Sequence, residues 1–176
     1  KTHEMVLRGL FGKVVRATTT KEQMDKGRLA ELSIDFARLR YSDLDCKIVK
    51  PLKYAEEIQW LICNKQRNQF IVDEAMNTDK NVLVLFNFIE KHGDVLIKMA
   101  HEHARAAGKQ IHYIHGEIDV QERERVRALV EQHDNIVIFA SYGTFSMGIN
   151  MKNLHKVIFA HPFKGRIRNL QTIGRG

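Results

Sequence analysis

The sequence has few cysteines and no long apolar run. Its 176 residues include only Cys46 and Cys63. These two lack the paired spacing of a zinc module, and they are too few for a disulfide framework. No apolar run approaches the roughly 20 residues that a helix needs to cross a bilayer, and Lys1 opens the chain without a secretory signal sequence. We therefore expect no membrane partner and a reducing, cytoplasmic location. Because no initiator Met precedes Lys1, we also expect the start to be a cut.

The sequence contains no recognisable phosphate-binding loop or metal site. Residues 9–13 (GLFGK) lack both the G-x-x-x-x-G-K-[ST] spacing and the Ser or Thr that would bind Mg²⁺. Residues 73–76 (DEAM) resemble an acidic metal-binding box by their letters, but they lie in an expected amphipathic helix rather than at the end of a buried strand. No Cys or carboxylate completes a metal-ligand spacing with His101, His103, His112 or His115, so we expect no metal site.

The chain is basic. Lys and Arg number 28 against 21 Asp and Glu, which gives a formal net charge of +7 and an isoelectric point near 9.5. This balance favours a polyanionic partner such as nucleic acid, although many mildly basic domains bind none. With 44% hydrophobic residues and no repeat or flexible linker, residues 1–176 are expected to form one monomeric domain.

Apolar runs alternate with helical periodicity from residue 81 onward, as in parallel βαβ units. Strands are expected at residues 81–86, 110–114, 135–140 and 156–160. Helices are expected at residues 90–107, with Val95, Leu96, Met99, His103 and Ala106 on one face, at 120–132, with Asp119 as N-cap, and from 166 to 174. Right-handed crossovers then place helices on both faces of a parallel sheet, an α/β fold.

The first fifty residues are less regular and are expected to be an N-terminal appendage of the same domain. Residues 14–17 and 36–41 are predicted to be short strands around a helical turn at 21–26. Pro51 marks a break. Residues 54–77 are predicted to form two helices, the second with Phe70, Ile71 and Ala75 at helical spacing.

Ligands of parallel sheets bind at the loops that follow the carboxyl ends of the strands. Residues 140–150 (ASYGTFSMGIN) combine hydroxyls, two glycines and an amide directly after a predicted strand. Backbone N–H groups and hydroxyls can bind phosphates, and glycine allows a nucleotide to approach the backbone closely. A Gly- and Ser-rich loop is by itself more often a simple turn, so this pattern gains weight only from its neighbours.

Residues 82–175 resemble the second RecA-like domain of a superfamily 2 DNA helicase, a P-loop NTPase-type fold. Residues 82–87 resemble motif IV, residues 115–117 (HGE) the block that follows it, residues 140–150 motif V, and residues 171–175 (QTIGR) the front of motif VI, Q-x-x-G-R-x-x-R. Residues 153–161 (NLHKVIFAH), 10–12 and 18–27 are similar to the bacteriophage UvsW-type helicases, which act on branched DNA in recombination, repair and replication. The second arginine of motif VI would fall beyond Gly176, so the resemblance implies a domain truncated within motif VI.

The resemblance implies half of a split ATP site. ATP and Mg²⁺ would be held between this domain and a first RecA-like domain that carries the P-loop lysine and acidic box, so the fragment alone would bind and hydrolyse no ATP. Arg175 would stabilise charge on the γ-phosphate, Gln171 would orient the motif VI helix, and Gly148 and Asn150 would approach the nucleotide. Asn150 stands where relatives commonly have Asp, which puts a metal-linked or ribose-contacting role there in doubt.

The resemblance also implies a DNA face built mainly from backbone contacts, for branched or single-stranded DNA. Ser141 is the first candidate for a phosphate contact, followed by Thr144. Asn87, His115 and Gly116 lie at other strand ends, and Lys152 adds positive charge near the last strand.

Two other functions fit the same residues. A non-catalytic nucleic-acid-binding module with a Rossmann-like sheet would need only the basic rim and no ATP partner. The motor part of a restriction or chromatin-type translocase would differ only in its flanking domains.

Overall fold

The computed structural model describes residues 2–13, 18–27, 33–145, 151 and 153–162. The chain divides into two compact units, Lys1–Leu39 and Arg40–Gly176. Of the helices in the described ranges, none has the length and apolarity that crossing a bilayer requires.

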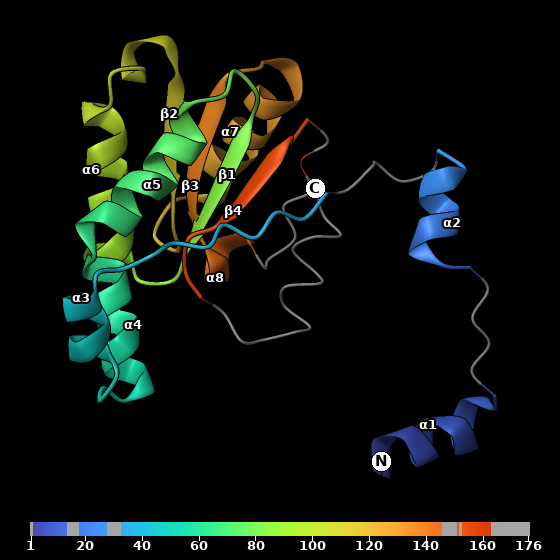
Figure 1. The fold of residues 1–176 in the computed structure, drawn as a ribbon. Coiled ribbons are helices and arrows are strands. Elements are labelled where there is room, and N and C mark those ends of the chain that lie inside the picture. Colours follow the sequence, from blue (N-terminus) through green and yellow to red (C-terminus); the bar gives the residue numbers. More distant parts are fainter. Residues whose placement is uncertain (1, 14–17, 28–32, 146–150, 152, 163–176) are drawn as a thin grey trace. The chain divides into compact units, whose positions relative to one another are not determined.

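The larger unit is built on a parallel sheet of four strands (Figure 1). Their order across the sheet is β2 (Gln110–Ile114), β3 (Ile136–Ser141), β1 (Val82–Phe86) and β4 (Lys156–Phe159). β1 pairs in parallel with both β3 and β4, and β2 pairs in parallel with β3. The predicted parallel α/β sheet is confirmed, and each strand bound lies within one residue of its prediction.

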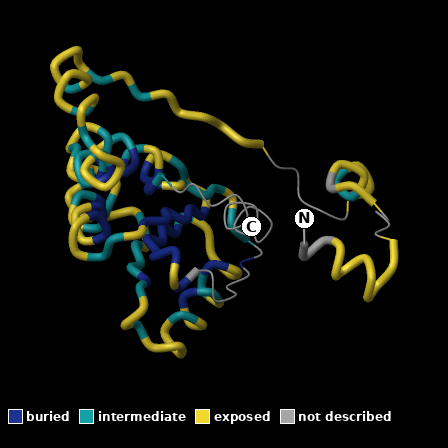
Figure 2. Tube along the Cα trace, turned by 90° about the horizontal axis from the view of Figure 1, so that it is seen from below, coloured by how far each residue is buried: buried dark blue, intermediate teal, exposed yellow. Residues whose placement is uncertain are grey.

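Helices cover both faces of this sheet (Figure 1). α5 (Lys65–Met76) and α6 (Asp94–Glu102) pack on one face, and α7 (Val120–Gln132) packs on the other. Successive side chains of a strand point to opposite faces, so Val82, Val84 and Phe86 of β1 join the first cluster while Leu83 and Leu85 join the second. Figure 2 shows the buried residues concentrated in the sheet and the helices against it.

Two further helices precede the sheet, α3 (Asp43–Val49) and α4 (Tyr54–Cys63). The predicted pair at residues 54–77 is confirmed as α4 and α5. Asn64 separates them because its side chain accepts a hydrogen bond from the backbone N–H of Arg67 at 2.9 Å, which caps α5. α7 begins after Asp119 as predicted, but that side chain makes no capping hydrogen bond.

The predicted helix at residues 90–107 is wrong in its form. The chain makes a π-helical turn (Ile89–Gly93), then α6, then a 3₁₀ turn (Ala106–Gly108). A Cβ at Gly93 would lie 2.6 Å from Cε2 of Phe86 and would also collide with the Tyr113 hydroxyl. The π turn shifts the helical phase, so Leu96 and Ala100 are the buried residues of α6 and Val95 is exposed.

The predicted strand at residues 36–41 is also wrong, since this segment is in no helix or strand. An extended segment counts as sheet only when it finds backbone partners, and propensity alone could not supply them. The predictions at residues 14–17 and 166–174 lie outside the described residues.

The smaller unit contains α1 (Thr2–Phe11) and α2 (Thr20–Asp25). α2 confirms the helical turn predicted at residues 21–26, and it starts with a capping box between Thr19 and Glu22. α1 exposes Met5, Leu10 and Phe11.

The side chain of Asn81 joins three segments at the amino-terminal edge of the sheet. Its Nδ2 donates toward the carbonyl oxygens of Val130 (3.1 Å), His133 (2.7 Å) and Asn153 (2.9 Å), and its Oδ1 accepts the N–H of Ile136 at 3.0 Å. The first two carbonyls end α7, where helical carbonyls lack partners within the helix. Asn81 is fully buried, and its hydrogen bond to the N–H of Ile136 is buried too, so water cannot replace it. The carbonyls of Val130 and His133 also accept from the side chain of Asn153.

We predict that Asn81→Ala lowers the free energy of unfolding by about 3 kcal/mol, because it leaves the buried N–H of Ile136 without a partner and removes three hydrogen bonds to carbonyl oxygens. Chemical denaturation of the chain measures this. Asn77→Ala, at an exposed position, is the control and should change stability by less than about 0.5 kcal/mol. Equal effects of the two substitutions would contradict the role assigned to Asn81.

Candidate functional site

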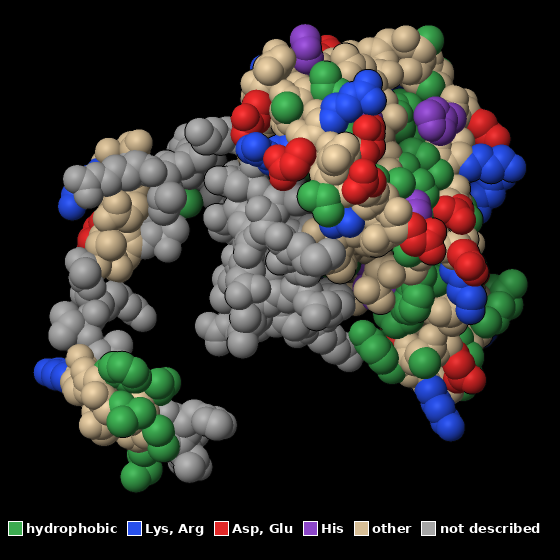
Figure 3. Space-filling model, turned by 180° about the vertical axis from the view of Figure 1, so that it is seen from behind, with side chains coloured by type: hydrophobic (Ala, Val, Ile, Leu, Met, Phe, Trp, Pro, Cys, Tyr) green, Lys and Arg blue, Asp and Glu red, His purple; other side chains and the backbone are tan. Residues whose placement is uncertain are grey.

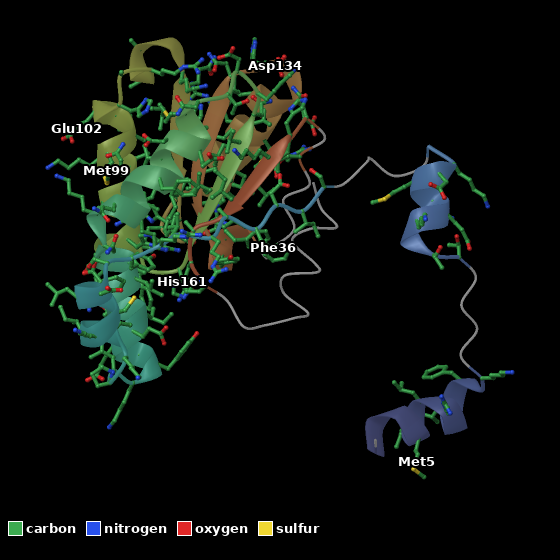
Figure 4. All side chains as sticks on the ribbon, viewed as in Figure 1. Met5, Phe36, Met99, Glu102, Asp134 and His161 are labelled. Atoms are coloured by element: carbon green, nitrogen blue, oxygen red, sulfur yellow. The ribbon has the colours of Figure 1, made fainter. Side chains whose placement is uncertain are left out.

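The carboxyl ends of the four parallel strands meet at one edge of the sheet. Asn87 follows β1, His115 and Gly116 follow β2, Ser141 ends β3, and Ala160 follows β4. Figure 4 labels His161 at this edge and Asp134 at the opposite one. The structure therefore brings Asn87, His115, Gly116 and Ser141 to the same edge, as the strand pattern predicts.

Ser141 and Thr144 form a hydroxyl pair at the centre of this edge. Ser141 ends β3 beside Phe86 of β1, and the one-turn helix α8 (Tyr142–Phe145) follows it. The two hydroxyl oxygens lie 2.9 Å apart, and the backbone N–H of Thr144 donates to Ser141 Oγ at 3.4 Å. Both residues are buried. Each hydroxyl has one hydrogen and two lone pairs, so the pair retains one hydroxyl hydrogen for a further acceptor.

The other predicted residues of this edge are more accessible. Asn87 and Gly116 are exposed, and nothing lies within 4 Å of a Cβ built on Gly116. The His115 side chain is mostly buried, with its ring centroid 5.0 Å from that of Tyr113 and its Nδ1 4.0 Å from a Glu117 carboxylate oxygen. Gly116 thus leaves its backbone open to a close approach.

A cluster of nitrogen-bearing side chains lies at the end of β4 and was missed from the sequence. Arg67 of α5 donates from Nη2 to the carbonyl of Ala160. His92, in the π turn, places Nε2 3.2 Å from Oδ1 of Asn68. The His161 ring meets that of Phe88 edge to face, with centroids 5.4 Å apart. Arg67 and Ala160 are 93 residues apart in sequence, so no local pattern predicts their contact.

Burial keeps the histidines of this cluster neutral. It lowers the pKa of His92 to about 3, and the charge of Arg67 and the neighbouring His161 act in the same direction. The pKa of His161 is also lowered, first by burial and then by Arg67. Burial lowers the pKa of Arg67 as well, but guanidinium keeps its charge at neutral pH. Arg67 is therefore the cation of the cluster.

Charges of both signs alternate on the surface seen in Figure 3. On α7, Arg125 pairs with Glu122, and Arg127 pairs with Glu124 and Glu131. These arginines are already neutralised, which makes the α7 surface a weak candidate for phosphate binding. A groove on the opposite helical layer is lined by Lys65, Asp94, Val95, Lys98, Met99 and Glu102.

Several predicted site residues lie outside the described residues, namely Gly148, Asn150, Lys152, Gln171 and Arg175. Among the described residues, no group of three or more His, Cys, Asp or Glu side chains could hold a metal ion. The described part of the predicted ATP and DNA region is thus the hydroxyl pair and the neighbouring strand ends. Hydroxyls and open backbone suit phosphate oxygens.

A family model described as the helicase conserved C-terminal domain matches residues 65–176. The chain belongs to this helicase family. It is 35% identical over 178 residues to the ATP-dependent DNA helicase uvsW of Enterobacteria phage T4, a match that covers 99% of this chain and 34% of that helicase. The chain therefore spans about a third of the length of this relative.

The fold agrees with a solved helicase structure. The crystal structure of T4 UvsW matches with a TM-score of 0.68 and 36% identity, over 78% of this chain and 27% of that chain. The predicted resemblance to UvsW-type helicases and the RecA-like fold are both confirmed.

We predict that acid destabilises this helicase domain in part through His92. The unfolded chain takes up a proton below the ordinary histidine pKa of 6.5, whereas folded His92 resists it down to about 3. The unfolding free energy contributed by His92 is therefore complete above pH 6.5 and falls as pH decreases toward 3, by about 2 kcal/mol at pH 5.

Chemical denaturation at pH 7 and pH 5 measures this loss. His92→Gln should lose less stability between the two values than the wild type, while His101→Gln, at an exposed position of α6, should behave as the wild type. His161 and His112, whose pKa values are also lowered by burial, account for a remaining acid dependence. An unchanged pH dependence in His92→Gln would contradict the prediction.

Proposed function

We propose that the chain is the C-terminal RecA-like half of an ATP-dependent superfamily 2 DNA helicase that acts on branched or duplex DNA in recombination, repair or replication. The observation that carries the proposal is the 35% identity to an ATP-dependent DNA helicase across 99% of the chain. That match includes all four strand ends at the candidate edge. Residues 1–50 would be an N-terminal appendage of the same domain, and the compartment would be the cytoplasm, that of the host if a phage encodes it.

In this proposal the domain supplies half of an ATP site. A first RecA-like domain contributes the P-loop lysine and the carboxylates that bind Mg²⁺, so this chain alone does not hydrolyse ATP. Arg175 neutralises charge that develops on the γ-phosphate, Gln171 orients the segment around it, and Gly148 and Asn150 approach the nucleotide. Preorganised positive charge of this kind accelerates phosphoryl transfer without covalent chemistry.

In the same proposal, DNA binds at the carboxyl ends of the strands. The hydroxyl pair of Ser141 and Thr144 donates to a phosphate the one hydrogen that is not used in their mutual hydrogen bond. Asn87 and Gly116 offer exposed polar groups. His115 lies at the same edge. Lys152 adds positive charge. Contacts to sugar and phosphate position a strand without reading its sequence, as a translocating enzyme requires.

We predict that Arg175→Ala in the complete helicase lowers kcat for ATP by about 10³-fold or more, because arginine fingers contribute factors of this size to kcat. The measurement is steady-state ATP turnover with DNA present. Arg105→Ala is the matched control, since Arg105 is half-exposed and pairs with Asp79 away from the candidate edge. Turnover at the wild-type rate in Arg175→Ala would contradict the assigned role.

We also predict that DNA stimulates ATP turnover by the complete helicase, most strongly with a four-way or forked junction. Turnover is compared with no DNA, single-stranded DNA and the junction at one ionic strength, because phosphate contacts weaken steeply with salt. Equal stimulation by single strands and junctions would argue against a branched substrate. No turnover under any condition would favour the non-catalytic binding module.

A further inference from the structure

The point at which the chain leaves β4 is held from three directions. The backbone N–H of Ala160 donates to Leu85 of β1 at 2.9 Å. Its carbonyl accepts from Arg67 of α5. The next side chain, His161, is buried against the ring of Phe88, which follows β1. Neighbouring backbone, a helix and an aromatic ring therefore converge on two consecutive residues.

The helix that carries Arg67 is itself fixed at this end. Asn64 caps α5, and the next residue after Arg67, Asn68, donates to the carbonyl of Ile62 at 2.7 Å and faces Nε2 of His92. Asn68 and His92 are both buried. The backbone that carries Arg67 is therefore fixed against α4 and the π turn, and the guanidinium of Arg67 in turn holds the carbonyl of Ala160.

The contact between Arg67 and Ala160 has a free-energy cost that holding α5 against β4 does not by itself require. Nη1 of Arg67 is buried without a hydrogen-bond partner among the described residues, and no carboxylate of the described residues forms an ion pair with this side chain. Burying an uncompensated charge costs free energy, and an apolar side chain of similar volume is often neutral or better for stability.

A second contact, with a smaller desolvation cost, joins α5 and β4 at their other ends. Lys156, at the start of β4, pairs with the carboxylate of Glu74 on α5 at 2.6 Å and donates to its carbonyl at 3.0 Å, with both side chains partly exposed. α5 and β4 are thus linked at both ends of the strand. The partly buried guanidinium of Arg67 lies at the end from which residues 163–176, with Gln171 and Arg175, continue.

We propose that Arg67 is a positioning residue for ATP hydrolysis, because it fixes where the chain leaves β4 for the segment that carries Gln171 and Arg175. This inference rests on the proposed function, in which Arg175 acts on the γ-phosphate. A misplacement of roughly 1 Å in a reacting geometry can cost two orders of magnitude in rate. A fixed carbonyl at Ala160 limits such misplacement at the root of the segment.

The test compares Arg67→Met, Arg67→Lys and Lys156→Met in the complete helicase. Arg67→Met removes the donor and the partly buried charge, and its kcat for ATP is expected to fall about 10- to 100-fold. The KM for ATP should change little, since the weakened interaction is made in the transition state. Arg67→Lys keeps a charged donor and should recover part of the lost kcat.

Lys156→Met is the matched control because it removes the other tether between α5 and β4. Its kcat should stay within about twofold of the wild type, as expected when an exposed ion pair of small energetic value is removed. Thermal unfolding of each variant separates stability from turnover. A fall in kcat confined to Arg67→Met, without a larger loss of stability than in Lys156→Met, supports the proposal.

Two results would overturn it. One is a wild-type kcat in folded Arg67→Met, and the other is an equal fall in kcat for Arg67→Met and Lys156→Met. If Arg67→Met does not fold, the comparison uses Arg67→Lys. The proposal then requires that Arg67→Lys has a lower kcat than Lys156→Met and an unchanged KM for ATP. Arg175→Ala, measured alongside, distinguishes failure of the proposed function from failure of this inference. Wild-type turnover in Arg175→Ala would contradict the proposed role of Arg175. A loss of turnover in Arg175→Ala but not in Arg67→Met would contradict only the role of Arg67.

Discussion

The buried amide of Asn81 sets the geometry on which the rest of the sheet depends. One side chain satisfies carbonyls at the end of α7, the carbonyl of Asn153 and the first N–H of β3. The backbone carbonyl of Asn81 also accepts from His155 and Lys156, at the start of β4. The starts of β1, β3 and β4 are therefore held in common. Since the strands have similar lengths, a common start also aligns their carboxyl ends, where the candidate residues lie.

Elements with local signals could be predicted from the sequence. The strand at residues 110–114 and the helix at 120–132 have the predicted bounds, because apolar spacing and flanking polar residues determine them locally. The π turn could not be predicted, since it depends on the absence of a side chain at Gly93 beside Phe86 and Tyr113. The segment at residues 36–41 has strand-like composition, but composition does not provide a pairing partner.

The candidate site also has a part that could be predicted from the sequence and a part that could not. Asn87, His115, Gly116 and Ser141 could be placed at one edge, because parallel strands bring their carboxyl ends together. The mutual hydrogen bond of Ser141 and Thr144 follows from a turn of α8 that only the structure reveals. The contact of Arg67 with Ala160 joins two distant parts of the chain, and the burial of His92 depends on the helices around it. Such contacts are set by tertiary packing rather than by a motif.

The contact between Phe86, Gly93 and Tyr113 has a mechanical consequence. Phe86 ends β1 and Tyr113 belongs to β2, two strands that β3 separates in the sheet, yet their ring centroids lie 5.5 Å apart. The π turn packs on both rings at Gly93, and the Tyr113 hydroxyl donates to Asp94 at the start of α6 at 2.7 Å. Close-packed interiors have low compressibility and transmit strain. A load applied at Asn87 would therefore spread across the strands beneath it and into α6, so this edge of the sheet would move as a stiff body.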